Sequence, residues 1–136
     1  MNNKLSAGAL FTVLSLLAFF IPEGTASAQC RLYRGADGQD IIGRVDGSMI
    51  YKGMYGFDIA AHFSEDVVYK GDYGFDVLGH FSGPGLFKER FGSEPMGRMD
   101  KGLIFKDGEK EAAGRAEGCK DEEAAALAIA LLSGLL

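Results

Sequence analysis

The residues best suited to chemistry are two histidines, each of which follows an aspartate by four positions. Asp58 precedes His62, and Asp76 precedes His80. An imidazole beside a carboxylate can act as a general acid–base pair or hold a metal ion. The two pairs are 18 residues apart and lie in matching sequence contexts. Internal repetition therefore explains their spacing without a dedicated site.

No other group supplies the remaining parts of an active site. Ser64 and Ser82 lie in expected turns, and the sequence G-x-S-x-G does not occur. The glycines fall at repeat turns, so no phosphate-binding loop is indicated. We therefore expect no catalytic residue, no cofactor and no bound metal. A hydrolase that uses His62 or His80 is a distant alternative.

The elements that position these residues come from an internal repeat of 18 residues. Residues 50–64 (IYKGMYGFDIAAHFS) recur at residues 68–82 (VYKGDYGFDVLGHFS), and the same step extends in both directions. The repeats begin at Leu32, Ile50, Val68, Leu86 and Ile104. The fifth repeat lacks one residue near Gly108. Such a period indicates one structural unit copied along the chain.

Each repeat predicts a β-hairpin followed by a polar turn. In the second repeat, residues 50–54 are β-prone, and residues 58–63 form the second strand. Gly56 between them can take the left-handed conformation of a three-residue hairpin loop. Five hairpins predict an all-β fold, a closed antiparallel meander that forms a shallow ten-strand barrel with pseudo-five-fold symmetry.

The register across the hairpin loop predicts which side chains face inward. If Met54 lies opposite Asp58, Tyr51 lies opposite Ala61, and the other repeats place an aromatic residue over a glycine. An aromatic ring over a bare glycine can fill a sheet face. The expected interior aromatic ring consists of Tyr33, Tyr51, Tyr69, Phe87 and Phe105.

Three columns of charge occupy the opposite face of the predicted sheet. The first is basic: Arg34, Lys52, Lys70, Lys88 and Lys106. The second is acidic: Asp40, Asp58, Asp76, Glu94 and Glu111. The third is basic again: Arg44, His62, His80, Arg98 and Arg115. We expect cross-strand ion pairs among them, and a dedicated anion site is the alternative.

Two cysteines bracket the repeats and support ring closure. An open meander would leave two unpaired edges, which closure removes. Cys30 lies just before the first repeat, and Cys119 lies at the end of the fifth. In a closed ring these points meet, so we expect a Cys30–Cys119 disulfide. Free or intermolecularly paired thiols are the alternative.

The C-terminal segment, residues 121–136, predicts an apolar helix. Asp121, Glu122 and Glu123 suit a helix N-terminus, where carboxylates meet the positive end of the dipole. Residues 124–132 (AAALAIALL) have no polar face, so the helix must be buried or lie in lipid. We expect it to plug the central channel, and membrane contact or self-association is the alternative. The expected plug residues are Leu127, Ile129, Leu131 and Leu132.

The N-terminal residues 1–28 have the plan of a cleaved secretory signal peptide. Lys4 precedes an apolar run over residues 5–21, and Ala26-Ser27-Ala28 supplies the small residues of a cleavage site. A retained membrane anchor is the alternative. Residues 29–120 then form the barrel, without a transmembrane span after cleavage. We expect a secreted or periplasmic protein of a bacterial cell envelope. The net charge of −5 without basic clusters argues against nucleic-acid binding.

The repeat motif, clearest in residues 33–46 (YRGADGQDIIGRVD) and 87–100 (FKERFGSEPMGRMD), resembles that of the β-flower proteins. Five copies match the five-fold type over residues 32 to about 120. The resemblance implies a shallow barrel of hairpin petals around an apolar channel, similar in outline to the tubby-like barrel with its central helix. It carries no catalytic motif and implies no activity. Repeat five departs from the pattern at residues 109–111, and His62 and His80 replace the usual arginine.

Aromatic residues at the hairpin tips are the remaining candidates for binding. They are Tyr55, Phe57, Tyr73 and Phe75, with Phe91 in the next repeat. Such rings can stack on sugars or enter a lipid interface, and packing between neighbouring hairpins is the alternative. His62 and His80 are the expected polar groups of a site there. We expect a non-enzymatic structural or interaction module of the envelope. The alternative is a binder of lipid or a small apolar ligand in the channel, with which the tail helix would compete.

Overall fold

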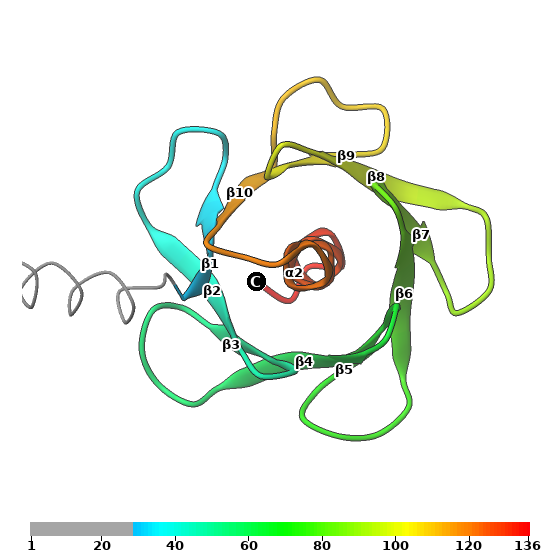
Figure 1. Ribbon diagram of the computed structural model, residues 1–136, viewed down its shortest axis with the longest axis horizontal. Helices are drawn as coiled ribbons and strands as arrows, with labels where there is room; N and C mark the ends of the chain where they lie inside the picture. Colours follow the sequence, from blue (N-terminus) through cyan, green and yellow to red (C-terminus); the bar gives the residue numbers. More distant parts are fainter. Residues whose placement is uncertain (1–28) are drawn as a thin grey trace, which may run out of the picture.

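A computed structural model describes residues 29–136 of the chain, so the expected signal peptide lies outside the described residues. Ten β-strands close into a ring, and one helix lies along its axis (Figure 1). The strands are β1 (Cys30–Arg34), β2 (Ile41–Asp46), β3 (Met49–Lys52), β4 (Ile59–Ser64), β5 (Val67–Lys70), β6 (Val77–Ser82), β7 (Gly85–Lys88), β8 (Pro95–Asp100), β9 (Leu103–Lys106) and β10 (Gly114–Glu117). The helix is α2 (Asp121–Leu132).

Every strand pairs antiparallel with its neighbours in the chain, and β1 pairs with β10 to close the barrel. At this seam Leu32 lies opposite Ala116, and Arg34 lies opposite Gly114. The predicted closed ten-strand meander is therefore confirmed. Five loops project outward from the ring (Figure 1). We call them petals 1 to 5: residues 35–40, 53–58, 71–76, 89–94 and 107–113.

The cysteines confirm the predicted disulfide at the same seam. The sulfur atoms of Cys30 and Cys119 are 2.04 Å apart and join residues separated by 89 positions. Cys30 begins β1, and Cys119 lies just beyond β10. The bond therefore links the two ends of the ring beside the last strand pair.

The predicted interior aromatic ring is wrong, and in four of the five hairpins a β-bulge accounts for the difference. In β3 and β4, Ile50 lies opposite Ala61 and Tyr51 lies opposite Ile59, so Ala60 is left over. The same shift occurs between β1 and β2, β5 and β6, and β7 and β8. Because of this one extra residue, the small residue of the second strand lies opposite the aliphatic residue of the first strand and not opposite the aromatic one.

The interior instead consists of the aliphatic residue that begins each repeat. These residues are fully buried, at 0% exposure: Leu32, Ile50, Val68, Leu86 and Ile104. Successive side chains of a strand point to opposite faces, so the aromatic residue that follows each one points outward. The aromatic residues on the outer face are Tyr33, Tyr51, Tyr69, Phe87 and Phe105.

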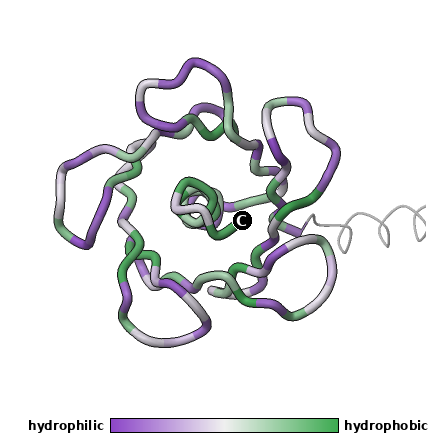
Figure 2. Tube along the Cα trace, turned by 180° about the vertical axis from the view of Figure 1, so that it is seen from behind, coloured by the Kyte–Doolittle hydropathy of each residue, from purple (hydrophilic) through white to green (hydrophobic). Residues whose placement is uncertain are grey.

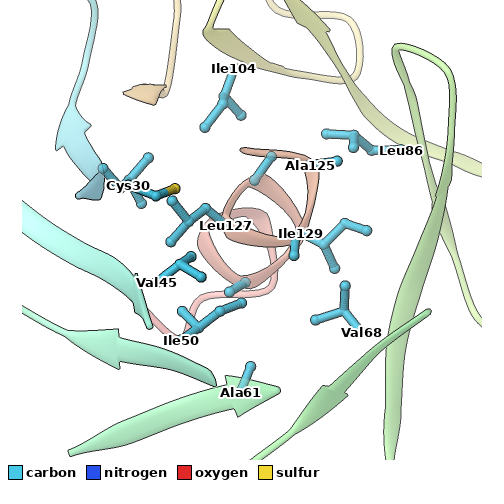
Figure 3. Close-up of a cluster of buried hydrophobic side chains, with 14 residues drawn as sticks. Cys30, Val45, Ile50, Ala61, Val68, Leu86, Ile104, Ala125, Leu127 and Ile129 are labelled. Atoms are coloured by element: carbon cyan, nitrogen blue, oxygen red, sulfur yellow. The ribbon is translucent and has the colours of Figure 1, made fainter. Parts of the chain in front are cut away.

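Helix α2 fills the bore of the ring, as the plug prediction requires. Leu127 and Ile129 are fully buried, and Leu131 and Leu132 pack against the core at partial exposure. Figure 3 shows Leu127 and Ile129 among wall residues such as Ile50 and Val68. The helix and much of the barrel wall are hydrophobic, whereas the petals are largely hydrophilic (Figure 2).

The helix begins where the acidic residues predict. The carboxylate of Glu123 accepts a hydrogen bond of 2.9 Å from the backbone N–H of Lys120. This contact satisfies one of the backbone donors that a helix N-terminus leaves without a partner. The carboxylates of Asp121 and Glu122 lie in the same first turn, at the positive end of the helix dipole.

A column of small residues in the wall makes room for the helix. It comprises Gly43, Ala61, Gly79, Gly97 and Gly114. A Cβ atom added at Gly97 would lie 2.6 Å from Cδ1 of Leu132 and 2.3 Å from the backbone oxygen of Phe105. At Gly114 it would lie 2.8 Å from Cδ2 of Leu131. These glycines therefore allow the barrel wall and α2 to approach each other closely. They do not lie beneath aromatic rings, contrary to the prediction from the sequence.

Candidate functional site

The outer aromatic residues each pair with a basic residue of the preceding hairpin. The guanidinium carbon of Arg44 lies 4.6 Å from the ring centre of Tyr51, and the rings of His62 and Tyr69 stack at 5.1 Å. The remaining pairs are His80 with Phe87 at 5.2 Å, Arg98 with Phe105 at 4.4 Å, and Arg115 with Tyr33 at 4.4 Å. Five such pairs encircle the ring. Stacking of this kind stabilises through the negative face of the aromatic ring when the partner is a cation.

Most of these basic residues also hold the base of the next petal. Nδ1 of His62 lies 2.9 Å from the carbonyl oxygen of Gly71, and Nδ1 of His80 lies 2.8 Å from that of Glu89. Arg44 donates hydrogen bonds to the carbonyl groups of Gly53 and Gly56. A carbonyl group can only accept, so Nδ1 of each histidine carries the hydrogen. We call this stack with its hydrogen bonds a bracket.

Both histidines take part in brackets. Within residues 29–136, neither His62 nor His80 is hydrogen-bonded to an aspartate. Asp58 instead lies 3.8 Å from Nζ of Lys52. The sequence proximity of aspartate and histidine therefore does not bring them together as an acid–base pair.

The charge columns pair in part as expected. Besides Lys52 and Asp58, Nζ of Lys88 lies 2.6 Å from a carboxylate oxygen of Glu94. The hydrogen bond and charge of Glu94 raise the pKa of Lys88 above its ordinary value. The third column does not join these pairs. Arg115 pairs with Glu117 at 2.6 Å instead, and the column as a whole stacks on the aromatic residues.

The bracket at the seam gives a direct test of this arrangement. Arg115 donates to the carbonyl oxygens of Ala36 at 2.7 Å and Gly38 at 3.1 Å, across the point where the ring closes. We expect Arg115→Lys to lower the free energy of unfolding by about 1–2 kcal/mol, because lysine lacks the planar fork that makes both bonds and the stack. Urea unfolding followed by circular dichroism measures the change.

A second cation–aromatic stack, which lacks such hydrogen bonds in the described chain, supplies the matched control. Arg98 stacks on Phe105 at a similar distance, but within residues 29–136 no hydrogen bond joins it to petal 5. We expect Arg98→Lys to cost less than about 1 kcal/mol, since only the stack is weakened. Equal losses in the two variants would show that the bonds of Arg115 to petal 1 contribute nothing.

The aromatic residues at the petal tips are exposed rather than packed between petals. Tyr55 and Phe57 of petal 2 are 81% and 89% exposed, and Tyr73 and Phe75 of petal 3 are 82% and 86% exposed. Phe91 of petal 4 is 88% exposed. These petals are neighbours around the ring (Figure 1). Petals 1 and 5 carry no aromatic residue.

Tyr69 lies at the centre of this sector and is the most buried of the outer aromatic residues, at 8% exposure. The ring of Phe75 meets its edge at 6.1 Å between centres. Arg90 of petal 4 donates a hydrogen bond of 2.8 Å to the hydroxyl oxygen of Tyr69. This contact joins petal 4 to the outer face of the hairpin that carries petal 3.

Sequence reasoning did not single out Arg90. A signal was present, because the equivalent positions of the other repeats hold Ala36, Met54, Asp72 and Gly108. Arg90 is therefore the only cation at this position in the five petals. This departure from the repeat is the feature of the sequence that distinguishes Arg90.

Comparisons with protein-family models, with curated proteins and with solved structures found no match. Among residues 29–136, no three side chains of histidine, cysteine, aspartate or glutamate gather in a way that could hold a metal ion. The described part of the chain also contains no helix long and apolar enough to cross a membrane. The petal tips and the surface beside Tyr69 form the candidate site, because exposed aromatic rings gather there around the Arg90–Tyr69 contact.

Proposed function

We propose that the protein is an exported, non-enzymatic interaction module of the cell envelope, which presents the aromatic tips of petals 2, 3 and 4 to a partner. The exposure of five aromatic rings on three neighbouring petals carries this proposal. Exposed aromatic residues are costly in water unless a partner covers them, and they dominate the energy of many interfaces. Because these rings lie only on petals 2, 3 and 4, the partner would contact that part of the ring.

The structure of the ring is suited to holding the petal tips rigidly. The barrel is closed, a disulfide links its ends, and brackets hold the bases of the petals. A pre-organised surface loses little conformational freedom when it binds. The export of the protein is supported by the disulfide and by the signal-like sequence of residues 1–28.

The alternative functions have less support. An apolar ligand in the channel would have to displace α2, whose Leu127 and Ile129 are fully buried there. A hydrolase would have to use His62 or His80, both of which hold petals through Nδ1. We also infer that the chain is a five-fold member of the β-flower proteins. Five hairpins around a central helix support that inference.

The test replaces the tip residues together. In the full chain we expect Tyr55, Phe57, Tyr73 and Phe75, all changed to serine, to abolish association with sedimented envelope fragments of the producing cells. Because these side chains are exposed, the urea unfolding midpoint should stay close to that of the unchanged protein. Co-sedimentation followed by immunoblotting measures the association.

The control changes four exposed residues on the petals that lack aromatic rings. It replaces Asp37, Gln39, Glu109 and Lys110 with serine, at or near the equivalent positions. This variant should sediment with envelopes as the unchanged protein does. Retained association of the aromatic variant, or equal loss in both variants, would refute the role of the tips of petals 2 and 3.

A further inference from the structure

A groove of about 620 Å³ opens on the outer face of the ring beside Tyr69. Its lining comes from the turn after β4, from β5 and β6, and from petal 4. The side chains that matter here are Glu65, Asp66, Tyr69, His80, Arg90 and Phe91. The volume lies within the range of about 300–1,000 Å³ that is typical of small-molecule sites.

Arg90 makes this place on the ring different from the four equivalent places. Besides its bond to the Tyr69 hydroxyl, its guanidinium carbon lies 5.6 Å from the ring centre of Tyr69 and 5.9 Å from that of Phe91. Arg90 therefore lies between the buried ring and the exposed ring. The equivalent position in the other petals holds no cation, so the pseudo-symmetry is broken at this place.

The groove combines an exposed aromatic ring with the carboxylates of Glu65 and Asp66. The ring of Phe91 is 88% exposed, although it borders a groove. Within the described chain, no hydrogen bond or ion pair engages the carboxylates of Glu65 and Asp66. Ser64 and Ser82 add two hydroxyl groups to the lining. The groove thus offers an apolar platform beside hydrogen-bond acceptors and donors.

This combination selects a class of ligand. An anion would meet two carboxylates and a chain of net charge −5, so it is disfavoured. A wholly apolar molecule would bury charged side chains without partners, which costs free energy. A sugar ring has one face of C–H groups and an edge of hydroxyl groups, and it matches both parts of the groove.

We propose that this groove binds a sugar unit of a neutral glycan. The C–H face of the sugar stacks on Phe91, and its hydroxyl groups donate to the carboxylates of Glu65 and Asp66 and accept from Arg90. The proposal rests on the proposed function, to which it adds the chemical class of the partner. Tyr69 acts as a positioning residue, because its hydroxyl group holds Arg90 at the groove.

The test measures binding of the purified, disulfide-bonded full chain to neutral oligosaccharides. The probes are hexasaccharides of glucose, mannose, xylose and N-acetylglucosamine, titrated by calorimetry. We expect at least one of them to bind, and we expect Phe91→Ala and Asp66→Asn each to weaken that binding at least about tenfold. Asp66→Asn keeps the size of the side chain and removes the charged acceptor.

Asp37→Ala is the control for Phe91→Ala. Asp37 occupies the equivalent tip position on petal 1, is exposed and does not line the groove. It should leave saccharide affinity unchanged, because it shortens a tip side chain elsewhere on the surface. Loss of binding in Asp37→Ala as large as in Phe91→Ala would overturn the assignment to this groove.

Two further outcomes would overturn the glycan proposal while the proposed function stands. One is that none of the hexasaccharides binds although the chain still sediments with envelopes through its tips. The other is that the groove binds a lysine-rich peptide, included as a fifth probe, and no saccharide. Failure of envelope association with retained saccharide binding would refute the tip proposal alone.

Discussion

The protein with both Cys30 and Cys119 changed to alanine should lose about 4–5 kcal/mol of its free energy of unfolding. The disulfide joins residues 89 positions apart, so it encloses all ten strands of the barrel. In the chain-entropy treatment, cross-linking so long a loop removes a large part of the conformational freedom of the unfolded state. Equilibrium unfolding in urea, followed by circular dichroism, measures the loss.

Reduction supplies an independent form of the same experiment. A thiol reductant should lower the unfolding midpoint of the unchanged protein to about that of the double alanine variant. The variant itself should not respond, since both cysteines of the sequence are absent from it. If the double variant does not fold in buffer, urea unfolding of the unchanged protein with and without reductant still measures the contribution of the disulfide. A loss below about 1 kcal/mol would contradict the role of the bond in closing the ring.

The second large effect is expected in the bore, where Leu127→Ala should lower the free energy of unfolding by about 2–5 kcal/mol. Leu127 is fully buried and lies near Val45 and Ile50 of the wall (Figure 3). A closed barrel cannot collapse freely onto the space that the missing atoms leave, so the cavity persists and adds to the lost burial. Urea unfolding again measures the change.

Leu135→Ala is the control for this substitution. Leu135 lies beyond the last turn of α2 and is half-buried. The same chemical change should cost much less there, because solvent already reaches part of the side chain. A loss at Leu127 as small as that expected at Leu135 would mean that α2 does not pack in the bore in solution. That result would also reopen the channel to an apolar ligand.

The double cysteine variant and Leu127→Ala test different contributions to stability. The disulfide acts mainly on the unfolded chain, whereas Leu127 acts on the packing of the folded state. Cys30 and Leu127 belong to one buried hydrophobic cluster, so a variant that combines both changes can lose a different amount from the sum of the two. The ring is thus stabilised by the disulfide at its seam and by the packing of α2 in its bore.

Much of the architecture could be predicted from the sequence because it depends on periodicity. The 18-residue step specifies hairpins of equal length, and equal hairpins with twisted strands curl in one direction. The phase of Cys30 and Cys119 then predicts the seam. The apolar run after Glu123 predicts a buried helix, since no other environment in water accepts it.

The candidate site could be predicted only as a sector. The exposed tip aromatic residues stand out because they interrupt an otherwise polar loop pattern. The partner of Arg90 could not be found, since Tyr69 lies 21 positions away in a different hairpin. The groove depends on that contact and on the position of the turn after β4.

The inward face of the barrel was decided by tertiary structure alone. Ile50 and Tyr51 are both apolar enough to be buried, so alternation within β3 does not distinguish its two faces. One bulged residue, Ala60, sets the choice by shifting the register so that Ile50 meets Ala61. Because the space between the barrel wall and α2 is narrow, an aliphatic side chain fits there better than an aromatic ring. The sequence by itself determined the number of hairpins, the seam and the helix, whereas packing around that helix decided which side chains face it.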